Sequence, residues 1–213
     1  MGWKLALVAA LTITAASAQT WEVAPVAGYL RLSKKAIGST IGTGPKTEDT
    51  SLHSLQPAYG LRVTLNTSGY YGLEAQYLRS KARLDTQLIP EGTETRVPAS
   101  GNLWLNQFSF NGISYFMPDE ARFRPFMTVG VQVANFGKPH IADWPNRSSR
   151  KLGLNYGGGV KIWLFRNALL RLDVRDIITG APYDLQTTES SSSLSSIGRF
   201  HQLEGTMGIG FRF

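Results

Sequence analysis

The chain of 213 residues contains no cysteine. This absence excludes an extracellular fold stapled by disulfides and any metal site built on thiolates. Only three histidines are present, His53, His140 and His201, and they lie far apart in the sequence. None of them has the spacing to a second ligand that a metal-binding helix motif requires. We therefore expect no cofactor and no metal centre.

Long apolar runs and helical periodicity are also missing beyond the first residues. No run of about 18 apolar residues follows residue 18, so the sequence predicts no transmembrane helix there. A chain that crosses a membrane without such a helix must form a closed β-barrel, because lipid cannot satisfy unpaired backbone groups. The net charge of +7 would suit nucleic acid, but the basic residues are scattered rather than clustered. We expect no nucleic-acid partner.

Residues 1–18 have the form of a secretory signal peptide. Lys4 supplies the positive charge, Leu5–Ile13 form a short apolar region, and Ala16-Ser17-Ala18 form a cleavage site of small residues. The alternative, a membrane anchor, would need a longer apolar run. We expect residues 1–18 to be removed on export and residues 19–213 to form the mature domain.

Beyond residue 18, apolar and polar residues alternate with a period of two, which indicates strands with two different faces. In the last segment the odd positions from Leu203 to Phe213 are apolar apart from Gly205, and the even positions are polar or glycine. The eight alternating segments are about Trp21–Ser33, Ser54–Asn66, Tyr70–Leu84, Leu103–Met117, Pro125–Phe136, Gly153–Phe165, Ala168–Ile178 and His201–Phe213. Their lengths suit strands that cross a membrane obliquely.

The connections between these segments alternate in length. The short ones are 66–69, 118–124 and 166–168, and the long ones are about 34–53, 85–102, 137–152 and 179–200. All short turns therefore fall at one end, as in outer-membrane barrels with short periplasmic turns and longer extracellular loops. The sequence predicts an all-β fold, an eight-stranded antiparallel up-and-down transmembrane β-barrel with both termini at the periplasmic end.

Aromatic residues concentrate near the ends of the segments, as expected for two belts at the lipid–water interfaces. The predicted periplasmic belt contains Trp21, Tyr70, Tyr71, Tyr115, Phe116, Phe126, Trp163, Phe165, Phe211 and Phe213. The predicted extracellular belt contains Tyr29, Tyr59, Tyr77, Trp104, Phe136 and Phe200.

Three stretches, "YGGGVKIWL" (156–164), "LRLDVRDIIT" (170–179) and "GIGFRF" (208–213), resemble the small outer-membrane β-barrel family of Gram-negative bacteria. This family includes the OmpA transmembrane domain and the opacity-type porin-like barrels, and the likeness spans the predicted mature chain. It implies assembly by the outer-membrane barrel machinery, which reads a last strand that ends in an aromatic residue. Phe211 and Phe213 match that signal. Unlike full-length OmpA, the chain has no periplasmic peptidoglycan-binding domain after the last strand, which puts a role in tethering to the cell wall in doubt.

Eight charged residues lie on the faces opposite the apolar ones and should point into the lumen, because Arg or Lys facing lipid costs roughly 2–4 kcal/mol. These residues are Arg62, Glu74, Lys161, Arg171, Asp173, Arg175, Glu204 and Arg212. Glycines at 157, 159, 208 and 210 leave room for them. The favoured interpretation is a salt-bridge network that fills a narrow barrel. The alternative is a narrow pathway for ions or small solutes.

An enzyme that modifies lipid A is a weaker alternative. It would need a serine nucleophile with a nearby base. His201 faces lipid by parity, but Glu204 points inward, and the nearest serines, Ser195 and Ser196, lie in a low-complexity loop at Thr187–Ser196. A soluble barrel of lipocalin type is a further alternative, because alternation alone does not say which face is inside.

The sequence thus predicts a non-catalytic outer-membrane protein with a structural or surface-interaction role. Its expected partners are outer-membrane lipid, lipopolysaccharide and, during biogenesis, the assembly machinery, and we expect a monomer. Lys34 and Lys35, in the first long loop, could contact lipopolysaccharide phosphates or could simply be solvated at the rim.

Overall fold

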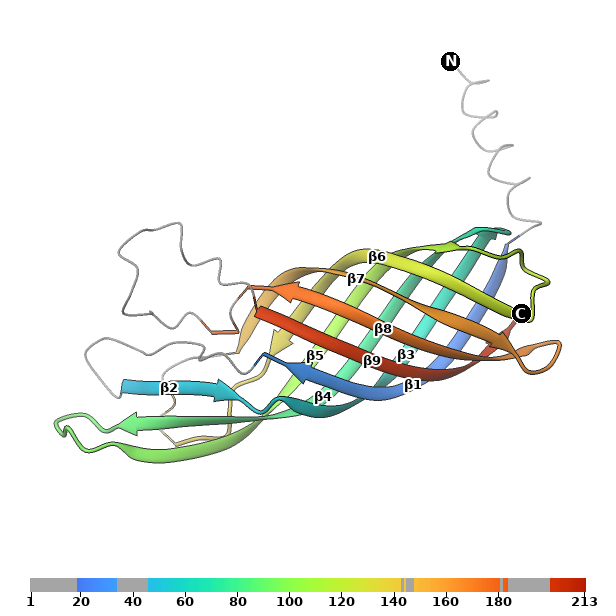
Figure 1. Cartoon of the computed structure of the whole chain (residues 1–213). Coiled ribbons are helices and arrows are strands. Elements are labelled where there is room, and N and C mark those ends of the chain that lie inside the picture. The colour runs from blue at the N-terminus through green and yellow to red at the C-terminus, as the bar shows by residue number, and fades with distance from the viewer. Residues whose placement is uncertain (1–18, 34–45, 143, 145–147, 181, 184–199) are drawn as a thin grey trace, which may run out of the picture.

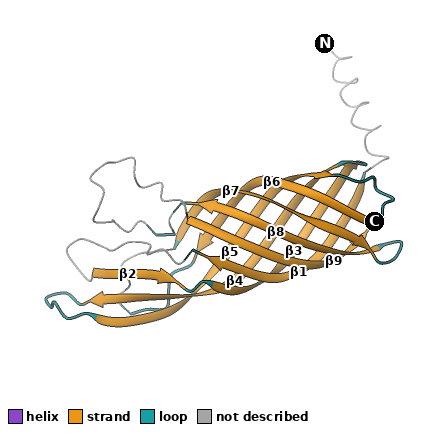
Figure 2. Cartoon of the chain, in the orientation of Figure 1, coloured by secondary structure: helices purple, strands orange, loops and turns teal. Residues whose placement is uncertain are grey.

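The computed structural model describes residues 19–33, 46–142, 144, 148–180, 182–183 and 200–213. The predicted signal peptide, the Thr187–Ser196 segment and both Lys34 and Lys35 lie outside these residues. No helix in the described part is long and apolar enough to cross a membrane. The described residues are organised by strands (Figure 2).

The described residues form nine strands, whose arrangement is drawn in Figure 1. They are β1 (Thr20–Leu32), β2 (Lys46–Leu52), β3 (Leu55–Ser68), β4 (Tyr71–Ile89), β5 (Val97–Tyr115), β6 (Phe123–Phe136), β7 (Ser149–Trp163), β8 (Ala168–Thr179) and β9 (Phe200–Arg212). All of them except β2 pair antiparallel in a closed circle, in which β9 returns to β1. Trp21 and Phe213 complete the closure, since each backbone N–H donates to the carbonyl of the other. The predicted eight-stranded barrel is confirmed.

The register fixes how the strands wind around the barrel. A row of paired residues that starts at Val160 of β7 goes once round and returns to β7 at Arg150, which is ten positions (160 minus 150) nearer the long loops. The row passes through Leu172, Met207, Ala27, Tyr59, Arg79, Asn106 and Asn135. Such a shift means that the strands are tilted, and paired rows climb obliquely toward the long-loop end.

The long-loop end departs from the sequence prediction. The stretch at about 34–53 was expected to be a long loop, but it contains β2, which pairs with the outer part of β4. The loop predicted at 85–102 is mostly an extension of β4 and β5, which leaves only residues 90–96 between them. The inner face of this extension carries threonines, and the Thr50 and Thr86 hydroxyls lie 2.9 Å apart. Because this extension has polar residues on both faces, its sequence lacks the alternation of apolar and polar residues that indicates the other strands.

Side chains alternate between an exposed apolar surface and a buried interior. Val129 and Leu154 are 65% and 62% exposed, whereas Arg62 and Arg175 are each 1% exposed. A soluble barrel would place these two sets the other way round. The lipocalin-type alternative is therefore wrong.

Four aromatic residues assigned to the belts lie in the interior instead. Tyr115, Phe126, Phe136 and Phe200 are all buried. Their positions share the parity of the inward-facing residues on their strands, and proximity to a strand end does not override that parity. Trp21, Phe116, Phe211 and Phe213 do lie on the exposed face at the short-turn end.

Candidate functional site

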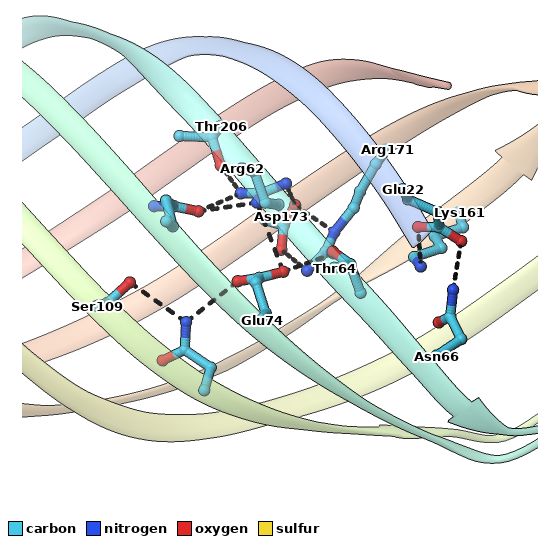
Figure 3. Close-up of polar contacts among 12 residues, drawn as sticks. Glu22, Arg62, Thr64, Asn66, Glu74, Ser109, Lys161, Arg171, Asp173 and Thr206 are labelled. Atoms are coloured by element: carbon cyan, nitrogen blue, oxygen red, sulfur yellow. Dashed lines mark hydrogen bonds and ion pairs between the residues drawn. The ribbon is translucent and has the colours of Figure 1, made fainter. Parts of the chain in front are cut away.

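A dense cluster of buried charged side chains lies in the lumen around Asp173 of β8 (Figure 3). Its carboxylate accepts a hydrogen bond from Arg62 at 2.7 Å. Arg171 donates through both Nε and Nη2, at 3.0 and 2.9 Å. Arg175 donates through Nη2 at 2.9 Å. One buried carboxylate thus holds three guanidinium groups that come from two opposite walls.

Glu74 of β4 is the second carboxylate of this cluster. It lies 2.6 Å from Nη1 of Arg171 and 2.8 Å from Nη2 of Arg175. Arg62 is also within ion-pair distance, at 3.5 Å. β3 and β4 pair with each other, whereas β8 pairs with β7 and β9, so the network ties β8 to the β3–β4 pair across the lumen.

Glu204 joins the central cluster through a residue that the sequence did not single out. Gln76 donates to Glu204 at 2.8 Å, and its own oxygen accepts from Nε and Nη2 of Arg62 at 2.8 and 2.6 Å. Three arginines are thus enclosed with three carboxylates. An isolated charge in this interior would be very costly, so their close pairing is the condition for burying them.

Lys161 was expected in the same network, but it lies in a separate cluster nearer the short turns. Its ammonium group forms an ion pair with Glu22 and donates to the Tyr115 hydroxyl at 2.6 Å. Asn66 donates to Glu22 at 2.8 Å and accepts from Tyr115 at 2.7 Å. Glu22 is hard to recognise from the sequence as a lumen residue, because most of its face on β1 is apolar (Ala24, Val26, Leu30 and Leu32).

Arg212 is placed differently again, at the rim of the short-turn end. It forms an ion pair with Asp119, on the turn between β5 and β6, and is 26% exposed in its side chain. Arg124 donates to the same carboxylate at 2.8 Å, and its guanidinium lies 3.5 Å from the centre of the Tyr115 ring. These contacts hold the turn against the short-turn end of the lumen. Arg212 occupies the last inward position of β9, too near the end to reach the central cluster.

The long-loop end of the lumen is filled by apolar side chains. This apolar cluster consists of Leu30, Leu32, Leu52, Ala58, Ala82, Leu84, Leu103, Leu105, Ala134, Phe136, Ile141, Trp144, Tyr183 and Phe200. The Phe136 ring lies 6.3 Å from Phe200 and 6.4 Å from Tyr183. Burial raises the pKa of Tyr183, so its phenol stays protonated and donates to the Gly137 carbonyl at 2.7 Å.

Glycines on β7 make room for the large interior side chains. A Cβ at Gly157 would come within 2.9 Å of Cγ of Arg175, and one at Gly159 within 2.7 Å of the Phe126 ring. Both would also collide with the backbone of β8. The interior is therefore packed closely around side chains that need these gaps.

One wall of the lumen, on β5, β6 and β7, is polar but incompletely paired. Among the described residues, buried atoms without a hydrogen-bond partner occur in Gln107, Asn111, Thr128, Gln132 and Asn155. A polar wall of this kind can accommodate ordered water.

The residues weighed for a lipid-modifying or metal site are not brought together in the described part of the chain. His201 points outward, 3.4 Å from Asp176, whereas Glu204 lies on the opposite face of the same strand. Within the described residues, no group of three or more histidines and carboxylates could hold a metal ion. The charged groups neutralise one another, and they do not converge on an open cleft.

No protein-family model matches the sequence, and no curated protein matches it either. Solved structures do. Neisserial surface protein A has 13% identity and a TM-score of 0.57, covering 91% of this chain and 97% of its own. Ail of Yersinia pestis has 11% identity and a TM-score of 0.53, with coverages of 92% and 99%. The N-terminal β-barrel domain of Pseudomonas aeruginosa OprF has 13% identity and a TM-score of 0.50, with coverages of 91% and 97%. The chain therefore has the fold of the small, eight-stranded outer-membrane β-barrels.

Proposed function

We propose that the protein is a non-catalytic component of a bacterial outer membrane, exported by residues 1–18, with a closed lumen and a structural or surface-interaction role. The observation that carries this proposal is the series of buried side-chain clusters along the interior. The Asp119 turn, the Lys161 cluster, the Arg–Asp173 network and the apolar cluster follow one another along the barrel. An eight-stranded barrel has an interior just wide enough to be filled in this way.

The surface role is supported by the extension of β2, β4 and β5 at the long-loop end (Figure 1). This three-stranded sheet projects past the exposed apolar surface of the barrel, and it carries charged residues such as Arg83 and Asp85. Arg96, in the connection between β4 and β5, pairs with Glu48 of β2 at 2.7 Å. Two proteins with similar structures are described as a surface protein and an attachment invasion locus protein. Phe211 and Phe213, exposed at the other end, would serve the assembly machinery.

Conductance measurement in planar bilayers tests the closed lumen. We expect the inserted protein to give no conductance steps, because clusters of charged and apolar side chains follow one another along the interior. Heat-modifiable gel mobility of the same sample shows that the protein is folded. Reproducible steps from folded protein would favour a second candidate, a narrow solute channel, which the incompletely paired wall around Gln132 and Asn155 supports.

A further inference from the structure

A broad groove of about 860 Å³ crosses β7, β8, β9, β1 and β3 on the outward-facing surface. Its floor is made of residues with small or absent side chains, Gly158, Gly205 and Ala27. A Cβ added at Gly205 would meet no atom within 4 Å. The groove is bordered by Tyr29, Tyr59, Val160, Leu172, Val174 and Met207. It is therefore an apolar depression in a surface that faces hydrocarbon.

The direction of the groove follows from the register. It runs along the row from Val160 through Met207 and Ala27 to Tyr59, which climbs toward the long-loop end. Four strand spacings of about 4.8 Å make it roughly 19 Å long. One leaflet contributes roughly 15 Å of hydrocarbon, half of a core about 30 Å thick. An obliquely lying acyl chain of the outer leaflet matches this length and slope.

Two cations stand where the groove meets the next strand. The row continues from Tyr59 to its partner Arg79 on β4, and Lys81 follows on the same face. The Arg79 guanidinium lies 4.0 Å from the centre of the Trp104 ring. Neither Arg79 nor Lys81 has a carboxylate partner within the described part of the chain, whereas the next cation, Arg83, pairs with Asp85 at 3.2 Å. The end of the groove nearest the long loops thus carries two positive charges, Arg79 and Lys81, that no described carboxylate neutralises.

We propose that the groove and this cation pair together bind one lipid A molecule, the phosphorylated glycolipid of the outer leaflet. One acyl chain lies in the groove, and one phosphate meets Arg79 and Lys81. A phosphomonoester carries a charge of about −1.5 to −2 at neutral pH, which matches two cations better than the single charge of a phosphodiester lipid does. This inference rests on the proposed outer-membrane location, but it does not depend on the closed lumen.

The test is a titration of the folded protein in detergent micelles with purified lipid A, followed by native mass spectrometry. We expect one tightly bound copy for the unaltered protein. The double variant Arg79→Gln/Lys81→Gln should bind more than about tenfold more weakly. Gly205→Leu fills the floor of the groove and should also weaken binding. Its matched control is Gly112→Leu. Gly112 also faces outward with room for a side chain, since the nearest atom to an added Cβ is the Val129 carbonyl oxygen at 3.9 Å, but it lies on β5, outside the groove.

The control for charge is Arg150→Gln, an exposed cation on β7 that does not line the groove. Unchanged binding in Gly112→Leu and Arg150→Gln, with losses in the other two variants, would support the site. Equal losses in all four variants, no effect of Gly205→Leu, or equal affinity for phosphatidylglycerol would each overturn it. Heat-modifiable mobility is checked for every variant, so a failure of lipid binding in folded protein leaves the proposed function standing.

Discussion

Replacing Asp173 with asparagine is expected to lower the free energy of unfolding by about 3–5 kcal/mol. The substitution keeps the shape of the side chain but removes the charge that Arg62, Arg171 and Arg175 share. Three guanidinium groups would then face Glu74 and Glu204 alone inside a packed interior. Urea unfolding of the protein refolded into lipid vesicles measures the effect.

The matched control for this variant is Asp85→Asn. Asp85 also contacts an arginine, Arg83 at 3.2 Å, but its side chain is 44% exposed in the extension outside the barrel. Exposed pairs of this kind contribute only about 0–1 kcal/mol. If both substitutions had the same small effect, the central ion cluster would not be a structural element of the barrel.

Introducing arginine at Val129 is expected to destabilise the folded protein in vesicles by about 2–4 kcal/mol. Val129 is 65% exposed on the outward face of β6, between the exposed apolar residues Met127 and Val131, so the new charge would face hydrocarbon. Vesicle unfolding curves for Val129→Arg and for the unaltered protein give the difference directly.

The same chemical change at Val97 provides the comparison. Val97 is 45% exposed, but it is the first residue of β5 and lies in the extension at the long-loop end, beyond the part of the barrel that faces lipid. We expect Val97→Arg to change stability by less than about 0.5 kcal/mol, as is usual for surface substitutions. A similar cost at the two positions would mean that Val129 does not face lipid.

The barrel itself could be predicted from the sequence, because apolar and polar residues alternate along each strand of the barrel and so mark its outer and inner faces. Leu203 to Phe211 of β9 alternate clearly, and neither propensity nor distant contacts are needed to interpret them. The extension could not be predicted in the same way. Thr47 and Thr50 of β2 are buried polar residues, so their inward face has no apolar signature.

The contacts within the lumen were predictable only as a set of inward-facing residues. Arg62 and Asp173 are 111 positions apart in the chain, and their contact depends on register and tilt, which local patterns do not determine. The hydrogen bonds of Gln76 to Arg62 and Glu204, and of Tyr115 to Lys161, depend on the same register and tilt. The alternation of β5 and β6, followed to the ends of the strands, predicts that Tyr115 and Phe126 point inward.

The central claim is that the strands separate lipid on the outside from a packed, closed interior. Because the chain has no cysteine, single cysteines can be placed along β6 from Phe126 to Val133 and spin-labelled in vesicles. We predict high oxygen accessibility at Met127, Val129, Val131 and Val133, and low accessibility to both oxygen and a water-soluble nickel chelate at Thr128 and Gln132. High accessibility to the nickel chelate at Thr128 and Gln132 would show a water-filled lumen and contradict the account.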